Sequence, residues 1–217
     1  MNQGLIDTAA KEVPDTDRRI YGVAVAQVID NLDSSNQGRV QLHFPWLPGV
    51  EPWARVAVLM AGNDCGSYFI PQTGDEVLVA FVNGNIAAPC VIGCLWNGQD
   101  SPPSKSSQDA VNKRIIRTRL GHELIFDESE QTISITSSTG QKIVMGQETV
   151  EITTTQKTAS VKLETSGKIT LQADVSIDIK APKISINGTN LEFKGSAATS
   201  INGGNLCQIE GATVKIN

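Results

Sequence analysis

Side chains able to do chemistry are few in this sequence, and they are widely spaced. Cys90 and Cys94 stand four residues apart inside CVIGC, which alternates apolar and polar positions as a strand does. The density of cysteine is too low for a disulfide scaffold, so reduced, buried thiols are favoured over a metal site. The cysteines and histidines are Cys65, Cys90, Cys94, Cys207, His43 and His122.

Paired carboxylates are the other candidate for catalysis. Asp75 and Glu76 are adjacent, and neighbours on a strand point to opposite faces, so joint acid and base work is not expected. His43 lies in the strand-like QLHFPW and is predicted to be structural or on the surface. His122 follows Gly121 at a turn, where a hydrogen bond to the backbone is expected. The sequence therefore predicts no enzyme, no catalytic residue, no metal site and no cofactor.

A basic run, KRIIRTR at residues 113–119, holds four positive charges in seven residues. Such a run can contact phosphates, but on an alternating strand it is more often a solvated face. The preceding half of the chain carries an acidic excess, which does not suit a groove for single strands. We expect no nucleic-acid partner.

Composition places the chain among ordinary soluble proteins. It has 217 residues, 40% hydrophobic and 19% charged, and a net charge of -5. This length allows one or two domains. Its start, MNQGLIDTAAKEVPDTDRR, lacks the pattern of a secretory signal, and no apolar run is long enough to span a membrane. Assembly in the cytoplasm without a signal peptide is expected.

Residues 20–98 have short strand patterns separated by strong turn signals. Five strands suit a small Greek-key barrel. All three tryptophans, both tyrosines and three of the five phenylalanines fall here, and these rings are expected to fill the interior. In IPQTGDEV, Pro71 and Gly74 predict a turn that leads into an inward-facing alternation from Val77. The expected strands are 20–30, 38–47, 53–62, 76–84 and 89–96.

Two segments flank this predicted barrel. Residues 1–19 are charged and turn-prone, and are expected to be an N-terminal extension. Residues 99–112 are rich in Ser, Pro and Gln without apolar periodicity, which is typical of an exposed linker.

Residues 113–217 alternate with period two almost throughout, and no helix fits them. Apolar pairs such as Ile133/Ile135 and Val150/Ile152 recur, and from Val161 they step by eight, eight, seven and seven residues. A lone meander of such strands would gain about 1.5 to 3 kcal/mol for each fully buried aliphatic, against about 1.5 kcal/mol of entropy for each ordered residue. It would also leave apolar edges open.

An intertwined homotrimer solves this problem better than a single-chain solenoid, which needs wider coils and a richer interior. Three chains can each lend one face to a narrow prism. About eleven strands at 4.7 Å give a needle roughly 50 Å long. The side chains expected to face the three-fold axis are Val161, Leu163, Ile169, Leu171, Val175, Ile177, Ile179, Ile184, Ile186, Leu191 and Phe193.

Two stretches carry a family resemblance. GRVQLHFPWLPG with WARVAVLMAGNDCGSYFIPQTGDEVLVAFVNGNIAAPCVIGCLWNG resembles the OB-fold domain of the central spikes of contractile injection machines. These are phage baseplate assembly protein V and the VgrG spike of type VI secretion. RTRLGHELIFDES is similar to the segment that opens their triple-stranded β-helix. The resemblance covers residues 20–217, and its OB-fold motif residues here are Trp53, Arg55, Pro71, Gly74, Asp75 and Gly93.

The resemblance implies an OB-fold barrel followed by a trimeric β-helix needle that pierces the target envelope on sheath contraction. It implies a separate baseplate hub trimer, because no hub domain precedes the barrel. The His-x-His iron site of some short spikes is missing, so either the needle ends bluntly or a PAAR-type tip protein caps it. The expected tip or cap-binding residues are Val214, Lys215, Ile216 and Asn217.

Two alternatives from other functional classes remain. A β-helical polysaccharide lyase needs a cluster of acidic and basic groups on one face, and the sequence offers none. A trimeric OB-fold and β-fibre module that binds glycan or nucleic acid stays as the alternative function.

Overall fold

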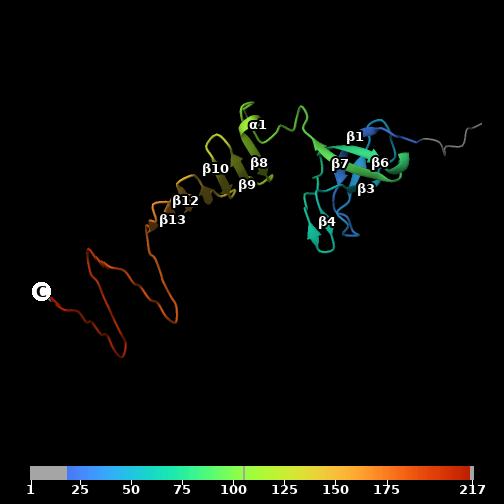
Figure 1. Ribbon diagram of the computed structural model, residues 1–217. Helices are drawn as coiled ribbons and strands as arrows, with labels where there is room; N and C mark the ends of the chain where they lie inside the picture. Colours follow the sequence, from blue (N-terminus) through green and yellow to red (C-terminus); the bar gives the residue numbers. More distant parts are fainter. Residues whose placement is uncertain (1–18, 105, 216–217) are drawn as a thin grey trace, which may run out of the picture.

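The computed structural model describes residues 19–104 and 106–215, and it is built almost wholly of β-structure (Figure 1). A barrel is followed by an open sheet and then by a long extended stretch. Within the described ranges the α-helical content is one turn, α1 (Asp109–Asn112). The prediction of an all-β chain is confirmed. No helix in these ranges is long and apolar enough to cross a membrane.

The barrel closes in the order β1-β2-β3-β7-β6, with β3 and β7 parallel and every other pair antiparallel. A 3-10 turn, η2 (Val82–Gly84), joins β6 to β7. The predicted five-stranded, OB-like barrel is confirmed. Its strands are β1 (Val23–Asp30), β2 (Val40–His43), β3 (Trp53–Val56), β6 (Glu76–Phe81) and β7 (Pro89–Leu95).

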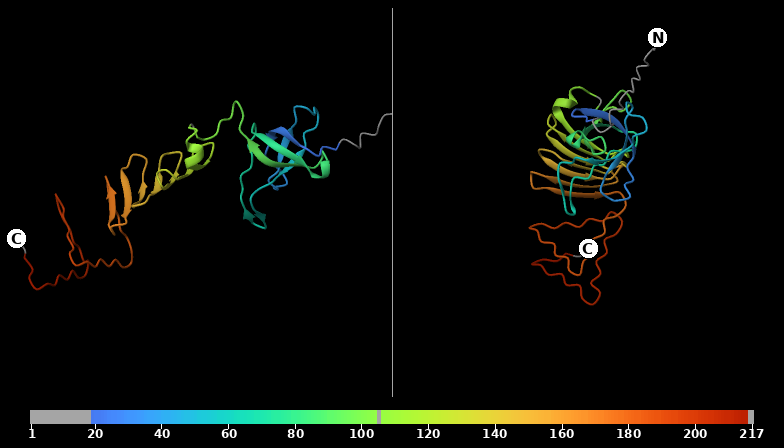
Figure 2. Two further views of the ribbon diagram at one scale, coloured as in Figure 1. Left: turned by 45° about the horizontal axis from the view of Figure 1, so that its top comes forward. Right: turned by 90° about the vertical axis from the view of Figure 1, so that its right-hand side faces the viewer.

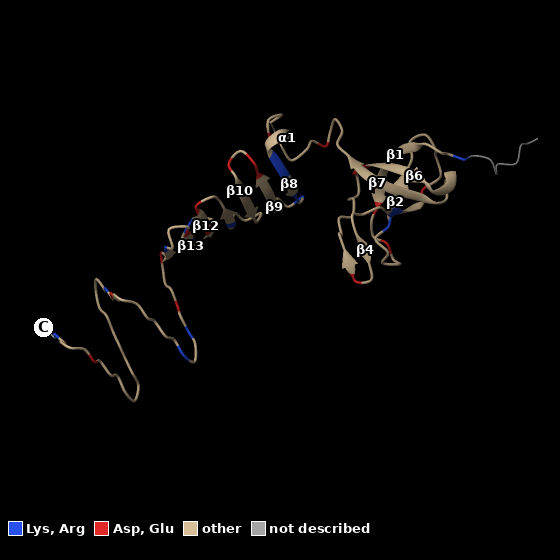
Figure 3. Ribbon diagram, viewed as in Figure 1, with Lys and Arg blue, Asp and Glu red and all other residues tan. Residues whose placement is uncertain are grey.

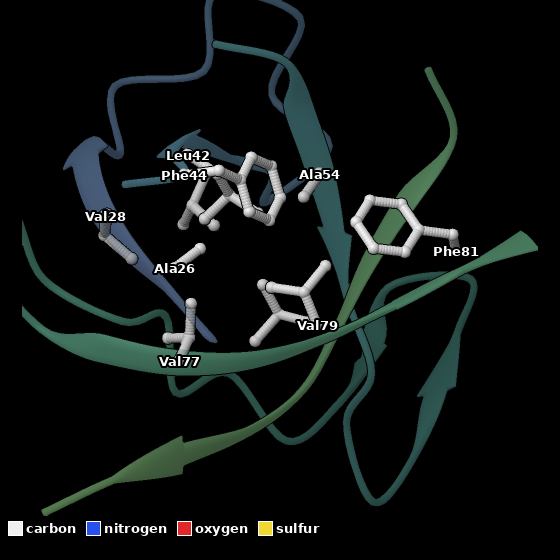
Figure 4. Packing of buried hydrophobic residues seen from close by; sticks show 10 residues of the cluster. Ala26, Val28, Leu42, Phe44, Ala54, Val77, Val79 and Phe81 are labelled. Atoms are coloured by element: carbon white, nitrogen blue, oxygen red, sulfur yellow. The ribbon is translucent and has the colours of Figure 1, made fainter. Parts of the chain in front are cut away.

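Alternation along these strands makes the core (Figure 4). Val77, Val79 and Phe81 point inward from β6, as predicted, and each is buried. Because closure turns one face of every strand toward the axis, period two is enough to build an interior. The buried hydrophobic side chains are Ala26, Val28, Val40, Leu42, Phe44, Ala54, Val77, Val79, Phe81 and Val91.

The prediction that aromatic rings fill the barrel was largely wrong. Phe44 and Phe81 are buried, with ring centroids 5.6 Å apart. Most of the other rings lie outside, for instance Tyr68 at 79% exposure and Trp96 at 68%. Five strands enclose a narrow interior, and valine, alanine and leucine fill most of it.

The strand predicted for residues 53–62 is also shorter than expected. β3 ends at Val56, and residues 58–69 leave the barrel as a hairpin arm with strands β4 (Ala61–Gly62) and β5 (Cys65–Gly66). The turn needs Asp64 at φ 56°, and Gly66 approaches the Met60 carbonyl so closely that a Cβ would lie 2.5 Å from its oxygen. Turn chemistry thus outweighs the apolar run here.

After the linker, seven strands form an antiparallel meander in chain order (Figure 2). Each pairs only with its sequence neighbours, so β8 and β14 are the two edges. The strands are β8 (Lys113–Arg117), β9 (Glu123–Asp127), β10 (Thr132–Thr136), β11 (Lys142–Met145), β12 (Thr149–Thr153), β13 (Ala159–Glu164) and β14 (Ile169–Ala173).

Residues 174–215 run extended, back and forth beyond the sheet, without helix or strand in the part of the chain described (Figures 1 and 2). The strands expected here therefore do not pair within one chain.

Candidate assembly surface

The register of the meander places residues directly opposite one another on the same face. One row crosses all seven strands and is aliphatic throughout. It runs Ile116, Leu124, Ile135, Ile143, Ile152, Val161 and Leu171.

A second row lies two residues along each strand, and therefore on the same face. It is apolar except at its first member, and it runs Arg114, Phe126, Ile133, Met145, Val150, Leu163 and Ile169. We call the two rows together the apolar face. None of its side chains is fully buried, and Ile169 is 67% exposed.

The opposite face is mostly polar. Lys162 and Glu164 form an ion pair at 3.0 Å, and Lys113 lies 3.0 Å from Asp109 and 3.6 Å from Asp127. These contacts raise the pKa of Lys113 and lower that of Glu164. Charged residues lie on β8 and around the strand connections (Figure 3). The polar face is therefore well solvated, whereas exposing the apolar face to water is unfavourable.

The extended stretch begins against this apolar face. A hollow of about 420 Å³ is lined by Ile152, Val161 and Leu171 together with Ile177. Asp174 N donates to Thr158 O at 2.9 Å, and residues 175–215, all described, make one hydrogen bond between backbone atoms, from Leu206 N to Gly203 O at 3.3 Å. Nearly all of this backbone is left without a protein partner in the single chain.

The structure brings some of the predicted axis-facing residues together and leaves others apart. Val161, Leu163, Ile169 and Leu171 share the apolar face. The remainder lie on the extended stretch and are exposed, from 50% at Ile184 to 96% at Val175; they are Val175, Ile177, Ile179, Ile184, Ile186, Leu191 and Phe193. Of the predicted tip, Val214 and Lys215 are exposed, whereas Ile216 and Asn217 fall outside the described residues.

The six predicted barrel motif residues are divided between strands β3 and β7 and the turn before β6, so they do not make one common site. Trp53 and Arg55 are on β3; the Arg39 guanidinium lies 5.8 Å from the centre of the Trp53 ring, and Arg55 is exposed. Gly93 is exposed on β7, opposite Leu78 beside a bulge.

The other three build the turn before β6. Pro71 is buried, and Gly74 adopts φ 97°, the conformation its prediction required. Gly74 N donates to Val28 O at 2.8 Å, which fastens the turn to β1. Asp75 accepts from Gln72 N at 2.7 Å and from Arg119 at 2.7 Å, so it links the barrel to the first connection of the sheet.

A loop that the sequence interpretation passed over is held by one carboxylate. Asp33 accepts hydrogen bonds from Ser35, from the backbone of Gln37, and from Arg39 through both Nε and Nη2, at 3.1 and 2.9 Å. The Arg39 guanidinium is the main reason that the pKa of Asp33 lies well below its usual range. The signal was DSSNQGR, a turn-rich run that contains both partners.

His122 hydrogen-bonds to backbone as predicted, since its Nδ1 accepts from Ser138 N at 3.1 Å. His43 Nδ1 lies 3.5 Å from Glu51 Oε1 at the surface. The expectation of buried thiols was wrong: Cys65, Cys94 and Cys207 are exposed and Cys90 is half-buried. Desolvation and the Asp75 carboxylate raise the pKa of the Cys94 thiol.

The barrel matches a known domain family. Residues 24–96 match the model of the Type VI secretion system/phage-baseplate injector OB domain. The resemblance to VgrG-like baseplate spike proteins predicted from the sequence is thereby confirmed.

Similarity extends into individual spike proteins. The chain is 31% identical over 134 residues to type VI secretion system spike protein VgrG3 of Vibrio cholerae, covering 55% of this chain and 13% of that protein. Spike protein VgrG4b of Pseudomonas aeruginosa is 29% identical over 155 residues, covering 60% and 19%. The actin cross-linking toxin VgrG1 of Vibrio cholerae is 30% identical over 121 residues, covering 53% and 11%. Each alignment spans at most a fifth of the relative.

Proposed function

We propose that this chain is the central spike of a contractile injection machine, a phage tail or a phage-tail-like particle, and that it works as a homotrimer. The apolar face carries this proposal. Two rows of mostly aliphatic side chains run the length of a sheet whose other face is mostly polar, and among the described residues only the start of the extended stretch, at Ile177, lies against them.

The size of the apolar face favours its burial between copies of the chain over its exposure to solvent in a monomer. Soluble monomers seldom expose contiguous apolar patches larger than a few hundred Å². Each fully buried aliphatic side chain contributes about 1.5 to 3 kcal/mol, and thirteen of the fourteen positions in the two rows are apolar. Three such sheets turned inward would share one dry core.

The extended stretch supports the same arrangement. A backbone that is extended and unpaired over forty residues satisfies its N–H and C=O groups either with water or with other chains. Pairing among three copies would give residues 174–215 the strands that one copy lacks, and would close the edge at β14. The meander and this stretch would then form a triple-stranded β-helix.

The proposed work is mechanical. In this arrangement residues 1–19 are an N-terminal extension, 20–98 the OB-fold barrel, 99–112 a linker and 113–217 the needle. A closed needle is stiff, and its polar outer face passes through a membrane with little adhesion. The barrels sit on a separate hub trimer and help nucleate baseplate assembly, and a PAAR-type protein caps the tip. No cofactor, nucleic acid or enzymatic step is required.

The decisive experiment is the mass of the purified full chain by light scattering during size-exclusion chromatography, with an unboiled SDS gel beside it. We expect three times 23.2 kDa and a band that enters the gel as a trimer. A clean monomer would remove the proposal and bring forward the alternative, a binding module, which a glycan and single-strand binding assay would then test.

A further inference from the structure

Arg114 is the one charged residue in the two rows of the apolar face. It occupies the first place of the second row, where every later strand puts a hydrophobic side chain. Its position is at the barrel end of the sheet, on the edge strand β8. In the proposed trimer, the Arg114 guanidinium would be buried in the core beside the aliphatic side chains.

The other members of the basic run have carboxylate partners within the chain. Lys113 pairs with Asp109, Arg117 lies 3.5 Å from Glu123, and Arg119 lies 2.7 Å from Asp75. Arg114 instead donates through Nη1 to two backbone carbonyls, those of Val111 and Lys113, at 3.1 and 3.0 Å. Among the described residues it has no acidic partner, and its Nε and Nη2 donors remain free.

A matching carboxylate stands at the same end of the sheet. Glu128 N donates to Asn112 O at 2.8 Å, just beyond Lys113 and Asp127, the last residue pair of β8 and β9. Glu128 is the first turn residue after β9, so it lies at the same end of the sheet as Phe126 and Arg114. Glu128 is exposed, and it forms no ion pair within the described part of the chain.

We propose that Arg114 and Glu128 pair between copies, so that the guanidinium of each chain binds the carboxylate of the next around a three-fold ring at the barrel end of the needle. This rests on the proposed trimer. Charge complementarity indicates that a second copy of this chain covers the apolar face, because its Glu128 supplies the carboxylate that Arg114 of the first copy lacks.

Such a ring sets the axial register of the three chains. The aliphatic rows repeat from strand to strand, so a copy displaced by one or two strands would still bury apolar surface. Displacement would leave Arg114 against aliphatics without a counter-charge, and an unpaired buried charge is strongly destabilising. A single polar position within an apolar repeat is a known means of fixing register and copy number.

The first experiment compares two neutralised arginines on the same strand of the full-length chain. Arg114→Gln should raise the chain concentration at which half the trimer dissociates by at least about tenfold. Arg117→Gln, on the polar face with its partner inside the chain, should leave it within about twofold. Equal behaviour of the two variants would overturn the proposal.

The second experiment separates pairing between copies from pairing within one. Arg114→Glu and Glu128→Arg should each lose most of the trimer, and the double variant should recover it. Chains carrying one change each, co-expressed with different tags, should recover mixed trimers in part, because a ring with two chains of one kind and one of the other restores opposite charges at two of its three contacts. Recovery in the double variant but not in the mixture would place the pair inside one chain and overturn the proposal. No recovery in either would overturn it too.

Tryptophan fluorescence of the barrel, read on every variant, checks that the N-terminal half is folded. A monomeric wild-type chain would refute the proposed trimer itself, and this inference with it. A trimeric wild type with indifferent Arg114 variants would refute only the pairing.

Discussion

The barrel and the sheet that follows it use the same alternation of apolar and polar residues, yet only the barrel has an interior. Ten hydrophobic side chains are buried in the barrel, whereas no residue in 113–215 is fully buried. The barrel closes through the β3–β7 pair, which joins strands far apart in sequence. The sheet pairs only sequence neighbours. Closure, and not alternation, decides whether a chain makes a core by itself.

This difference predicts where each region gets its stability. The barrel should be stable at any concentration, because its apolar residues meet one another within the chain. The sheet should depend on assembly, because within the described residues most of its apolar face is left uncovered.

The largest effect is expected from Ile152→Asp. Ile152 is the fifth of the seven residues in the first row, and in a trimer three carboxylates would meet there without partners. We expect complete loss of the trimer by light scattering, with the barrel still folded by tryptophan fluorescence. Thr153→Asp, one residue along on the polar face, is the control and should stay trimeric. Trimers from Ile152→Asp would show that this face is not the interface.

Phe44→Ala should do the reverse. Phe44 is fully buried in the barrel, and truncating such a ring costs about 3 to 5 kcal/mol. We expect the free energy of unfolding of the barrel, measured in urea, to fall by that amount. In the proposed trimer the sheet and the extended stretch should still hold the three chains together. Phe69→Ala on the exposed arm is the control, with an expected change within about 0.5 kcal/mol. Loss of the trimer together with the barrel would mean that the two regions are not independent.

The sequence was informative where local pattern and final neighbours agree. The inward alternation from Val77, the turn at Gly74 and the paired aliphatics such as Val161 and Leu163 were all anticipated, because period two and turn chemistry are local properties.

The sequence was misleading where amino-acid composition alone was used to predict which side chains are buried. Trp96 and Tyr68 were assigned to the interior because small barrels hold large rings, but the narrow barrel left them outside. Arg114 was treated as part of a solvated run, since assigning it to the apolar face requires the cross-strand register, which comes only from the pairing of β8 with β9. Whether three chains meet on that face depends on partners that one sequence does not contain.

Acid should weaken the barrel through Asp33. The pKa of Asp33 is depressed in the folded chain by Arg39, while an unfolded aspartate has a pKa of about 3.9. A depressed pKa gives stability that is present above the unfolded value and is lost as pH falls toward the folded value. The barrel melting temperature, followed by tryptophan fluorescence, should therefore drop from about pH 5 downward.

Asp33→Asn should melt lower than wild type at pH 7 and show a flatter acid dependence. Asp64→Asn, at the tip of the exposed arm, is the matched control and should keep the wild-type slope. An unchanged slope in Asp33→Asn would place the acid sensitivity elsewhere.

The smallest effect is expected at the contact between the two regions. Arg119 and Asp75 lie 2.7 Å apart, but their side chains are 68% and 32% exposed. An exposed ion pair of this kind contributes about 0.2 to 1 kcal/mol to stability, so Arg119→Gln should lower the free energy of unfolding of the barrel by no more than that. Because Asp75 also holds the turn before β6, a double-mutant cycle with Asp75→Asn isolates the pair. A coupling energy well above about 1 kcal/mol would mean that barrel and needle act as one unit, and the contrast between self-sufficient and assembly-dependent halves would have to be given up.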